Sequence, residues 1–212
     1  MTHSPATVPV IHVVDDDDAF RRSLLFLLES MGWEAVGHTS AEAFLAAAPQ
    51  LSPAGGCLLL DIRMPRISGL ELQRRLRHAG SLFPVLFMTG HGDIELAVQA
   101  MKEGALDFLQ KPFKDQAILD AVERAVASSR AQLLASQRSR LAQGRLELLS
   151  PRETEVARQL ALGLTNKEVA RVLGISENTV HVHRQHIMDK TGVSGAAELT
   201  RLILCANPAG LD

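Results

Sequence analysis

Four short apolar runs in the chain each lead into a polar group that could take part in a reaction. Val10–Val14 is followed by Asp15 and Asp16, Cys57–Leu60 by Asp61, Val85–Met88 by Thr89, and Ala105–Leu109 by Lys111 and Pro112. Runs of this kind are typical of strands that are buried on both faces of a parallel sheet. Because ligands bind beyond the carboxyl ends of such strands, we expect the four polar endings to lie close together.

Asp61 is the candidate nucleophile among these groups. A carboxylate can attack phosphorus to form an acyl phosphate, and Mg²⁺ would offset the repulsion between the two anions. Two carboxylates of the run Asp15–Asp18, with Asp61 and one backbone carbonyl, would supply a partial oxygen shell for that ion. Lys111 adds a second positive charge, and the hydroxyl of Thr89 can donate a hydrogen bond to the same phosphoryl oxygens. The series predicts a phosphorylation site.

Taken one at a time, these residues also have structural explanations. The acidic run Asp15–Asp18 could cap a helix and interact with the positive end of its dipole. Thr89 could be an ordinary strand-end residue and Lys111 a solvated lysine. A calcium-binding loop that starts at Asp15 fits poorly, since alanine and phenylalanine stand where it needs a ligand and a glycine. The order of the whole series favours phosphoryl chemistry.

The elements that would position these groups alternate between strand and helix. The expected strands are Val10–Val14, Trp33–Gly37, Cys57–Leu60, Val85–Met88 and Ala105–Leu109, and the expected helices are Ala19–Met31, Ser40–Ala48, Gly69–His78, Asp93–Lys102 and Asp115–Ala127. Such alternation predicts an α/β fold with a five-stranded, doubly wound parallel sheet, covered by helices on both faces.

Composition and charge set broader limits. Residues 1–127 carry 11 Lys/Arg against 16 Asp/Glu, whereas residues 128–212 carry 11 against 8, so the second part is the better suited to approach nucleic acid. No apolar stretch approaches the roughly 20 residues of a membrane span, and Met1–Val10 lacks the features of a signal peptide. We therefore expect a cytoplasmic protein without membrane contact. Cys57 and Cys205 lie in apolar segments and are expected to be reduced core thiols.

The second part of the chain is predicted to be all helical. Leu134, Leu141 and Leu148 are seven residues apart, which indicates a connecting helix that could pair weakly with a copy of itself. Ser150-Pro151-Arg152-Glu153 and Thr165-Asn166-Lys167-Glu168 have the capping-box pattern that starts helices. A helix over Glu177–Lys190 would follow a short turn, and a helix-turn-helix places its second helix in the major groove of DNA.

The first part resembles the receiver domains of two-component response regulators. The matching motifs are Asp15-Asp16, Asp61-Ile62-Arg63-Met64-Pro65, Thr89-Gly90, Phe108 and Lys111-Pro112-Phe113. The resemblance implies a flavodoxin-like fold in which Asp61 accepts a phosphoryl group from a sensor histidine kinase and Lys111 contacts the phosphate. It also implies a cis bond before Pro112, since proline is the residue that permits one.

The same resemblance implies a metal site and a switch. Mg²⁺ would be held by Asp15, Asp16, Asp61 and the backbone carbonyl of Arg63. Thr89 would move toward the phosphoryl group, and Phe108, which stands where many receivers have tyrosine, would turn into the vacated space. Val98, Lys102 and Asp107 are the residues expected at a dimer interface after phosphorylation. Leu199, Leu202 and Ile203 could add a second contact on DNA, although ordinary packing within the domain is the favoured reading for Leu199 and Ile203. The alternative is release of a clamp between the two parts of the chain.

The back part resembles the LuxR-type helix-turn-helix, from Leu149 to Leu204. Val180, Ile187 and part of His183 should face the domain core. The residues expected to meet base edges are Asn178, His181, Val182 and Gln185, and those expected to meet phosphates are Lys167, Thr179, Arg184 and Lys190. His181 departs from the family, which often has lysine there.

The whole chain thus resembles a full-length regulator of the NarL/FixJ class. The expected division is a receiver domain over 1–127, a linker helix over 128–148 and a small all-helical DNA-binding domain over 149–212. The implied function is phosphorylation-controlled transcription regulation through double-stranded promoter DNA, with RNA polymerase open as a further partner. The protein would not be an enzyme beyond accepting a phosphoryl group and losing it again.

Two other classes share parts of this pattern. Phosphatases of the haloacid-dehalogenase type also use an aspartyl phosphate, but they have a second aspartate two residues after the nucleophile, where this chain has Arg63. A LuxR-type quorum sensor would carry a small-molecule pocket in front, with no need for Asp61, Thr89 and Lys111. Stable retention of phosphate from a small phosphodonor would exclude both.

Overall fold

The computed structural model describes residues 8–47, 55–81, 83–90 and 94–211. The chain forms two compact units, Met1–Leu133 and Leu134–Asp212, which are described separately below as the first and the second unit. The expectation about a signal peptide concerns Met1–Val10, most of which lies outside the described residues. In the part of the chain that the structure describes, no helix is both long and apolar enough to cross a bilayer.

The first unit is built on a five-stranded parallel sheet with the order β2-β1-β3-β4-β5, which confirms the predicted fold. The strands are β1 (Val10–Val14), β2 (Glu34–His38), β3 (Gly56–Asp61), β4 (Val85–Thr89) and β5 (Asp107–Gln110). The helices are α1 (Asp18–Ser30), α2 (Ala41–Ala47), α3 (Gly69–His78), α4 (Ile94–Lys102) and the start of α5 (Asp115–Leu146). The reversal of strand order beside β1 creates the crevice where such sheets bind ligands.

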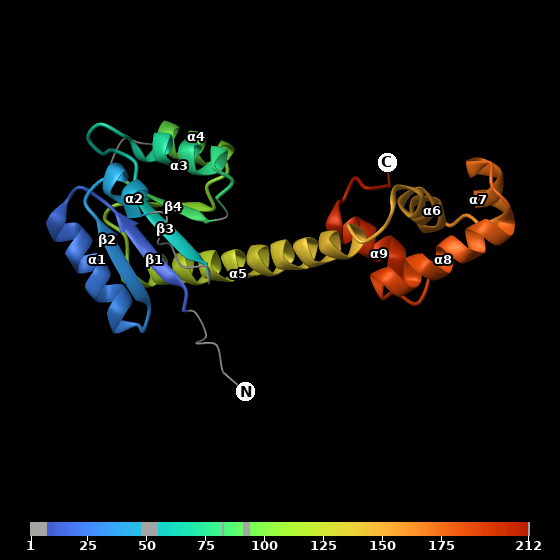
Figure 1. The fold of residues 1–212 in the computed structure, drawn as a ribbon. Coiled ribbons are helices and arrows are strands. Elements are labelled where there is room, and N and C mark those ends of the chain that lie inside the picture. Colours follow the sequence, from blue (N-terminus) through green and yellow to red (C-terminus); the bar gives the residue numbers. More distant parts are fainter. Residues whose placement is uncertain (1–7, 48–54, 82, 91–93, 212) are drawn as a thin grey trace. The chain divides into compact units, whose positions relative to one another are not determined.

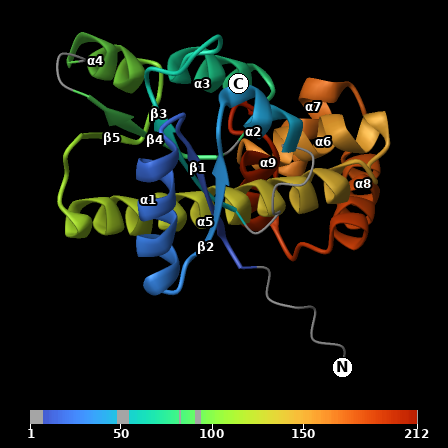
Figure 2. The same cartoon turned by 90° about the vertical axis from the view of Figure 1, so that its left-hand side faces the viewer.

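Alternation along the central strands divides the core into two layers. Ile11 and Val13 of β1 pack with α1 and α5, whereas Val14 of β1 and Leu60 of β3 pack with α2, α3 and α4 on the other face. Figures 1 and 2 show the sheet between these two groups of helices. Because both faces are covered, the three central strands β1, β3 and β4 consist mainly of apolar residues, whereas the edge strands β2 and β5 are partly exposed and carry polar ones.

Several boundaries differ from the expected ones. β5 begins at Asp107 rather than at Ala105. Just before it, the amide of Leu106 bonds to the carbonyl of Val85 in β4 at 2.8 Å. α1 begins at Asp18 because the side chain of Asp17 caps it, accepting bonds from the amides of Ala19 and Phe20. Ala48 and Asp93, at the ends of two predicted helices, lie outside the described residues. The predicted helix over Asp115–Ala127 continues without a break into the predicted linker, so that α5 has 32 residues.

The second unit contains the end of α5 and four further helices. These are α6 (Pro151–Ala161), α7 (Asn166–Leu173), α8 (Glu177–Thr191) and α9 (Ala196–Ala206). Both predicted capping boxes are present, at Ser150 with Glu153 and at Thr165 with Glu168. α7 and α8 end at Gly174 and Gly192, whose φ values of 65° and 64° belong to the left-handed region that glycine adopts without strain.

The structure decides between the expectations for α9. Cys205 is exposed, so its expected place in the core is wrong, whereas Cys57 is buried as expected, and burial raises the pKa of the Cys57 thiol to about 12. Leu199, Leu202 and Ile203 are buried in the core of the second unit, where they pack with residues of α6 and α8. Ordinary packing, the favoured reading for Leu199 and Ile203, is therefore confirmed, and the second contact with another copy is wrong.

Candidate functional site

The carboxyl ends of four strands bring the predicted reactive groups together. Asp15 follows β1, Asp61 ends β3, Thr89 ends β4 and Lys111 follows β5. The ammonium of Lys111 lies between two carboxylates, with Nζ 2.6 Å from Oδ2 of Asp15 and 2.7 Å from Oδ1 of Asp61. Residues separated by 96 and 50 positions in the chain therefore form one cluster because parallel strands end at the same edge.

Both carboxylates are held by the backbone as well as by the lysine. The amide of Asp17 donates to Oδ1 of Asp15 at 2.9 Å, and the amide of Arg63 donates to Oδ2 of Asp61 at 2.9 Å. The two side chains are nearly inaccessible to solvent, at 1% for Asp15 and 12% for Asp61. Each aspartate is thus fixed in orientation by partners that do not depend on a ligand.

In this cluster, burial and the ion pairs have opposite effects on the pKa of Asp61 and on that of Lys111. Burial raises the pKa of Asp61, and its hydrogen bond from Lys111 only partly opposes this. Burial alone would lower the pKa of Lys111, but its bonds to Asp15 and Asp61 outweigh that effect, so that the pKa lies above its usual value. The ring of Phe20 adds to the environment of the ammonium, with its centroid 4.1 Å from Nζ. Two carboxylates share one cation, which leaves a net negative site.

The donor chemistry of this site fits Mg²⁺. Its ligands would be carboxylate and carbonyl oxygens, which this ion prefers, and Asp15 and Asp61 both direct a carboxylate oxygen to the cationic Nζ of Lys111. Asp16 is exposed beside them. Within the described ranges, no three His, Cys, Asp or Glu side chains converge as a metal-binding group.

Thr89 and Phe108 lie on neighbouring strands but face different surroundings. Thr89 is buried, and its hydroxyl donates to the carbonyl of Gly90 at 3.0 Å. Phe108 is 42% exposed, and its ring is therefore directed away from the core. The bond between Lys111 and Pro112 is cis, as the resemblance implied. The proposed dimer residues Val98, Lys102 and Asp107 are at least partly exposed on α4 and β5, and Asp107 pairs with Arg124 at 2.7 Å.

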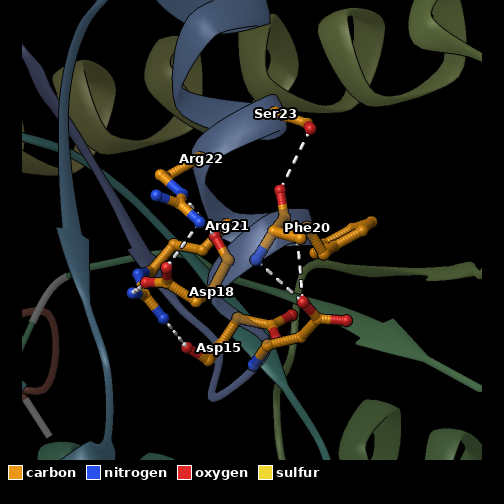
Figure 3. A network of polar contacts seen from close by, with 8 residues as sticks. Asp15, Asp18, Phe20, Arg21, Arg22 and Ser23 are labelled. Atoms are coloured by element: carbon orange, nitrogen blue, oxygen red, sulfur yellow. Dashed lines mark hydrogen bonds and ion pairs between the residues drawn. The ribbon is translucent and has the colours of Figure 1, made fainter.

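Two buried features of this region were not found from the sequence. Arg21 of α1 is buried beside the acidic loop, and Figure 3 shows its guanidinium directed toward Asp15 and Asp18. A signal existed, because Arg21 precedes Leu24 and Leu28 by three and seven residues and so lies on the apolar stripe of its helix. His12 and His38 form a buried pair, with Nδ1 of His12 3.1 Å from Nε2 of His38.

In the second unit, the predicted DNA contacts fall into two groups. The freely presented side chains are Lys167 on α7 and Asn178, His181, Val182 and Gln185 on α8, all of which are exposed. Val180 and Ile187 are buried and His183 is half-buried, as predicted. The remaining predicted contacts Thr179, Arg184 and Lys190 have partners within the unit.

Lys190 belongs to a second lysine–carboxylate pair. Its Nζ lies 2.7 Å from Oε2 of Glu153, a buried residue whose carboxylate also accepts the amide of Ser150 at 2.7 Å. These bonds, that from Lys190 foremost, lower the pKa of Glu153 to about 2. Arg184 donates through Nη1 to Oδ1 of Asn166 at 3.1 Å and so links α8 to the start of α7. These two bonds therefore hold α8 against α6 and α7.

Comparisons with known proteins agree with this organisation. Residues 11–123 match the response regulator receiver domain, and residues 147–203 match the bacterial regulatory proteins of the luxR family. The chain is 48% identical over 208 residues to the transcriptional regulatory protein FixJ of Azorhizobium caulinodans, covering 98% of this chain and 97% of that protein.

Solved structures show the same likeness over nearly the full length. The response regulator StyR has 41% sequence identity and a TM-score of 0.77, covering 92% of this chain and 98% of that chain. Full-length FixJ from B. japonicum has 42% identity and a TM-score of 0.59, covering 95% and 98%.

Proposed function

The chain belongs to the NarL/FixJ class of response regulators, which are phosphorylation-controlled transcriptional regulators, and on that premise we propose that Asp61 is its phosphorylated residue. The observation that carries the proposal is the position of Asp61 beside Asp15, with Lys111 paired to both. Of these two carboxylates, Asp61 is the less buried, and its pKa is raised chiefly by burial and in smaller part by the charge of Asp15.

The proposed reaction is transfer of a phosphoryl group from a phosphohistidine of a sensor kinase. A carboxylate oxygen of Asp61 attacks phosphorus, the P–N bond breaks, a P–O bond forms, and the imidazole leaves and takes up a proton. Lys111 pairs with the phosphoryl oxygens, and the hydroxyl of Thr89 turns from the Gly90 carbonyl to donate to them. Hydrolysis of the acyl phosphate would be the only other chemistry at the site.

Mg²⁺ is the proposed cofactor, with Asp15, Asp16, Asp61 and the backbone carbonyl of Arg63 as its ligands. When bound, it would offset the repulsion between the Asp61 carboxylate and the incoming phosphoryl group. The backbone amides that bond Asp15 and Asp61 keep one oxygen of each carboxylate in a fixed direction. Lys111 would exchange one of its carboxylate partners for the phosphoryl group.

The proposed output is dimerisation and DNA binding. Movement of Thr89 leaves space beside β4, and Phe108 on the neighbouring β5 would turn inward to fill it, which changes the face that carries Val98, Lys102 and Asp107. Two copies paired through that face would read half-sites of promoter DNA. In each copy Lys167 and the second-unit residues Thr179, Arg184 and Lys190 contact phosphates, and Asn178, His181, Val182 and Gln185 meet base edges. The proposed setting is the cytoplasm, where RNA polymerase is the next partner.

Asp61→Asn tests the assignment, because it keeps the shape of the side chain and removes the nucleophile. Incubation of the full-length protein with a small phosphodonor and Mg²⁺, followed by intact-mass measurement, should show one added phosphoryl group in the wild type and none in Asp61→Asn. Asp107→Asn, which removes an exposed carboxylate of the same unit, is the control and should be labelled like the wild type. Continued labelling of Asp61→Asn at another residue would refute the proposal.

A further inference from the structure

One buried charge near the proposed magnesium site has no place in the chemistry described so far. Arg21 has only 8% of its side chain exposed. Its Nη1 donates to the backbone carbonyl of Asp15 at 2.7 Å, and its Nη2 pairs with the carboxylate of Asp18 (Figure 3). A buried guanidinium is costly unless its donors are satisfied, and the planar fork of arginine suits two acceptors at once.

The contact from Arg21 completes the set of bonds that hold Asp15. The Asp15 amide donates to the carbonyl of His38 at 3.2 Å, its Oδ1 accepts from the amide of Asp17, and its Oδ2 accepts from Lys111. Its backbone carbonyl is the remaining polar group, and that carbonyl is held by Arg21. Arg21 is the one side chain among these partners that does not itself meet a reacting group.

A bond to the carbonyl of Asp15 also orients the next residue. The peptide group is planar, so the direction of the Asp15 oxygen determines where the nitrogen and Cα of Asp16 lie. Asp16 is exposed and makes its proposed contact through its side chain, which starts from that Cα. The strand beside the loop leaves room for this arrangement, since a Cβ at Gly37 would lie 3.2 Å from Cδ of Arg21.

We propose that Arg21 is a positioning residue that aims the peptide between Asp15 and Asp16 and so places the Asp16 carboxylate for Mg²⁺. The inference rests on the proposed function, which requires Mg²⁺ at this site. It assigns to Arg21 an effect on the affinity for the ion and not on the chemistry of Asp61, which Arg21 does not touch.

Arg22 provides a matched control. It follows Arg21 in the same helix and pairs with the same carboxylate, with Nη2 2.7 Å from Oδ2 of Asp18. Its side chain, however, is 72% exposed, and its contacts are with Asp18 and not with Asp15. Charge near the site and pairing with Asp18 are common to both arginines, whereas burial and the bond to the Asp15 carbonyl belong to Arg21 alone.

The first experiment measures Mg²⁺ binding to the full-length protein by isothermal titration with the metal alone. Arg21→Met should raise the Kd for Mg²⁺ about tenfold, as loss of a residue that orients a metal ligand typically does. Arg21→Lys, which keeps the charge but not the fork, should fall between Arg21→Met and the wild type. Arg22→Met should bind like the wild type. At saturating Mg²⁺, Arg21→Met should be labelled by a small phosphodonor at close to the wild-type rate, because Arg21 bonds to Asp15 and Asp18 and not to Asp61.

A double-mutant cycle tests the route of the effect. If Arg21 acts through Asp16, then Arg21→Met should cause no further loss of Mg²⁺ affinity in an Asp16→Asn background. An equal loss in both backgrounds would overturn the proposal, as would an unchanged Kd in Arg21→Met. Should Arg21→Met not fold, as judged by its far-ultraviolet spectrum, Arg21→Lys makes the same test, because a lysine lacks the planar fork that bonds to the Asp15 carbonyl and the Asp18 carboxylate at once. A wild-type protein that does not bind Mg²⁺ would refute the proposed metal site instead.

Discussion

Each unit of the molecule contains a buried carboxylate that is paired with a lysine, but the pKa of that carboxylate is raised in the first unit and lowered in the second. In the first unit, Lys111 is shared by Asp15 and Asp61, and burial raises the pKa of Asp61. In the second unit, Lys190 and the amide of Ser150 bond to Glu153 and lower its pKa to about 2. One cation for two carboxylates leaves a site that favours a further cation, whereas one carboxylate with several donors is a structural link.

The first way to sharpen this comparison is to remove each lysine. Lys111→Met should lower the free energy of unfolding of the first unit by about 3 kcal/mol, since it leaves two buried carboxylates without a cation. Lys190→Met should cost about 1 kcal/mol, because Lys190 is 40% exposed and Glu153 keeps its bonds to Ser150. Urea unfolding followed by Trp33 fluorescence measures the first unit, since Trp33 is the only tryptophan of the chain and packs against the core of that unit. Unfolding followed by far-ultraviolet circular dichroism also includes the helices of the second unit and so measures the loss in Lys190→Met.

The pH dependence provides the check on this prediction. Burial raises the pKa of Asp61, and removal of Lys111 takes away the partner that opposes this, so the carboxylate takes up a proton as the pH falls and the loss of stability in Lys111→Met should shrink toward acid pH. Trp33 fluorescence should report the loss in Lys111→Met and no change in Lys190→Met. Equal losses in the two variants, independent of pH, would show that the sites do not differ as described.

A second test uses the buried histidine pair, which has no counterpart among the described residues of the second unit. Burial, with the charge of His38 as a smaller cause, lowers the pKa of His12 to about 4 from an ordinary value of 6.5. Because the unfolded chain then binds a proton that the folded one does not, the first unit should lose stability as the pH falls from 6.5 to about 4. The loss should reach about 2–3 kcal/mol by the lower limit.

The corresponding measurement follows urea unfolding by Trp33 fluorescence between pH 4 and pH 8. His12→Gln, which cannot take up the proton, should flatten the decline on the acid side. His78→Gln, at an exposed position of α3, is the control and should keep the wild-type slope. If the slope in His12→Gln matched that of the wild type, the acid sensitivity would have to come from other groups.

The sequence predicted what depends on backbone pattern and missed what depends on distance between side chains. Asp15, Asp61, Thr89 and Lys111 could be placed at one edge because parallel strands all end there, whatever their exact register. The pairing of Arg21 with the carbonyl of Asp15 could not be predicted from the sequence, because it depends on where the first turn of α1 lies over β1. Glu153 was recognised as part of a capping box, but its partner Lys190 is 37 residues away on another helix.

The error at Cys205 has a different cause. Leu199, Leu202 and Ile203 have the helical spacing of a buried face, and Glu198, Thr200 and Arg201 lie on the other side of α9. Leu204 and Cys205 fall on that polar side and are exposed, so an apolar neighbourhood in the sequence was a poorer guide to burial than helical spacing. For α8, helical spacing predicted the core positions Val180 and Ile187, and both were confirmed.

The smallest expected effects are at the exposed surface of the second unit, where side chains without internal partners are proposed to act one by one. Lys167→Ala should weaken binding to all DNA sequences alike and reduce the slope of log affinity against log salt by about one, because one phosphate contact is lost.

His181→Ala should instead change the preference at one base pair, by about 1 kcal/mol if its ring contacts a base edge. Affinities of the phosphorylated full-length protein for a set of operator variants, measured at several salt concentrations, separate the two outcomes. Val172→Ala, at an exposed apolar position of α7, should change neither quantity. A uniform loss from His181→Ala, with a reduced salt slope, would mean that His181 contacts only the DNA backbone, and the reading of bases would then fall to Asn178, Val182 and Gln185.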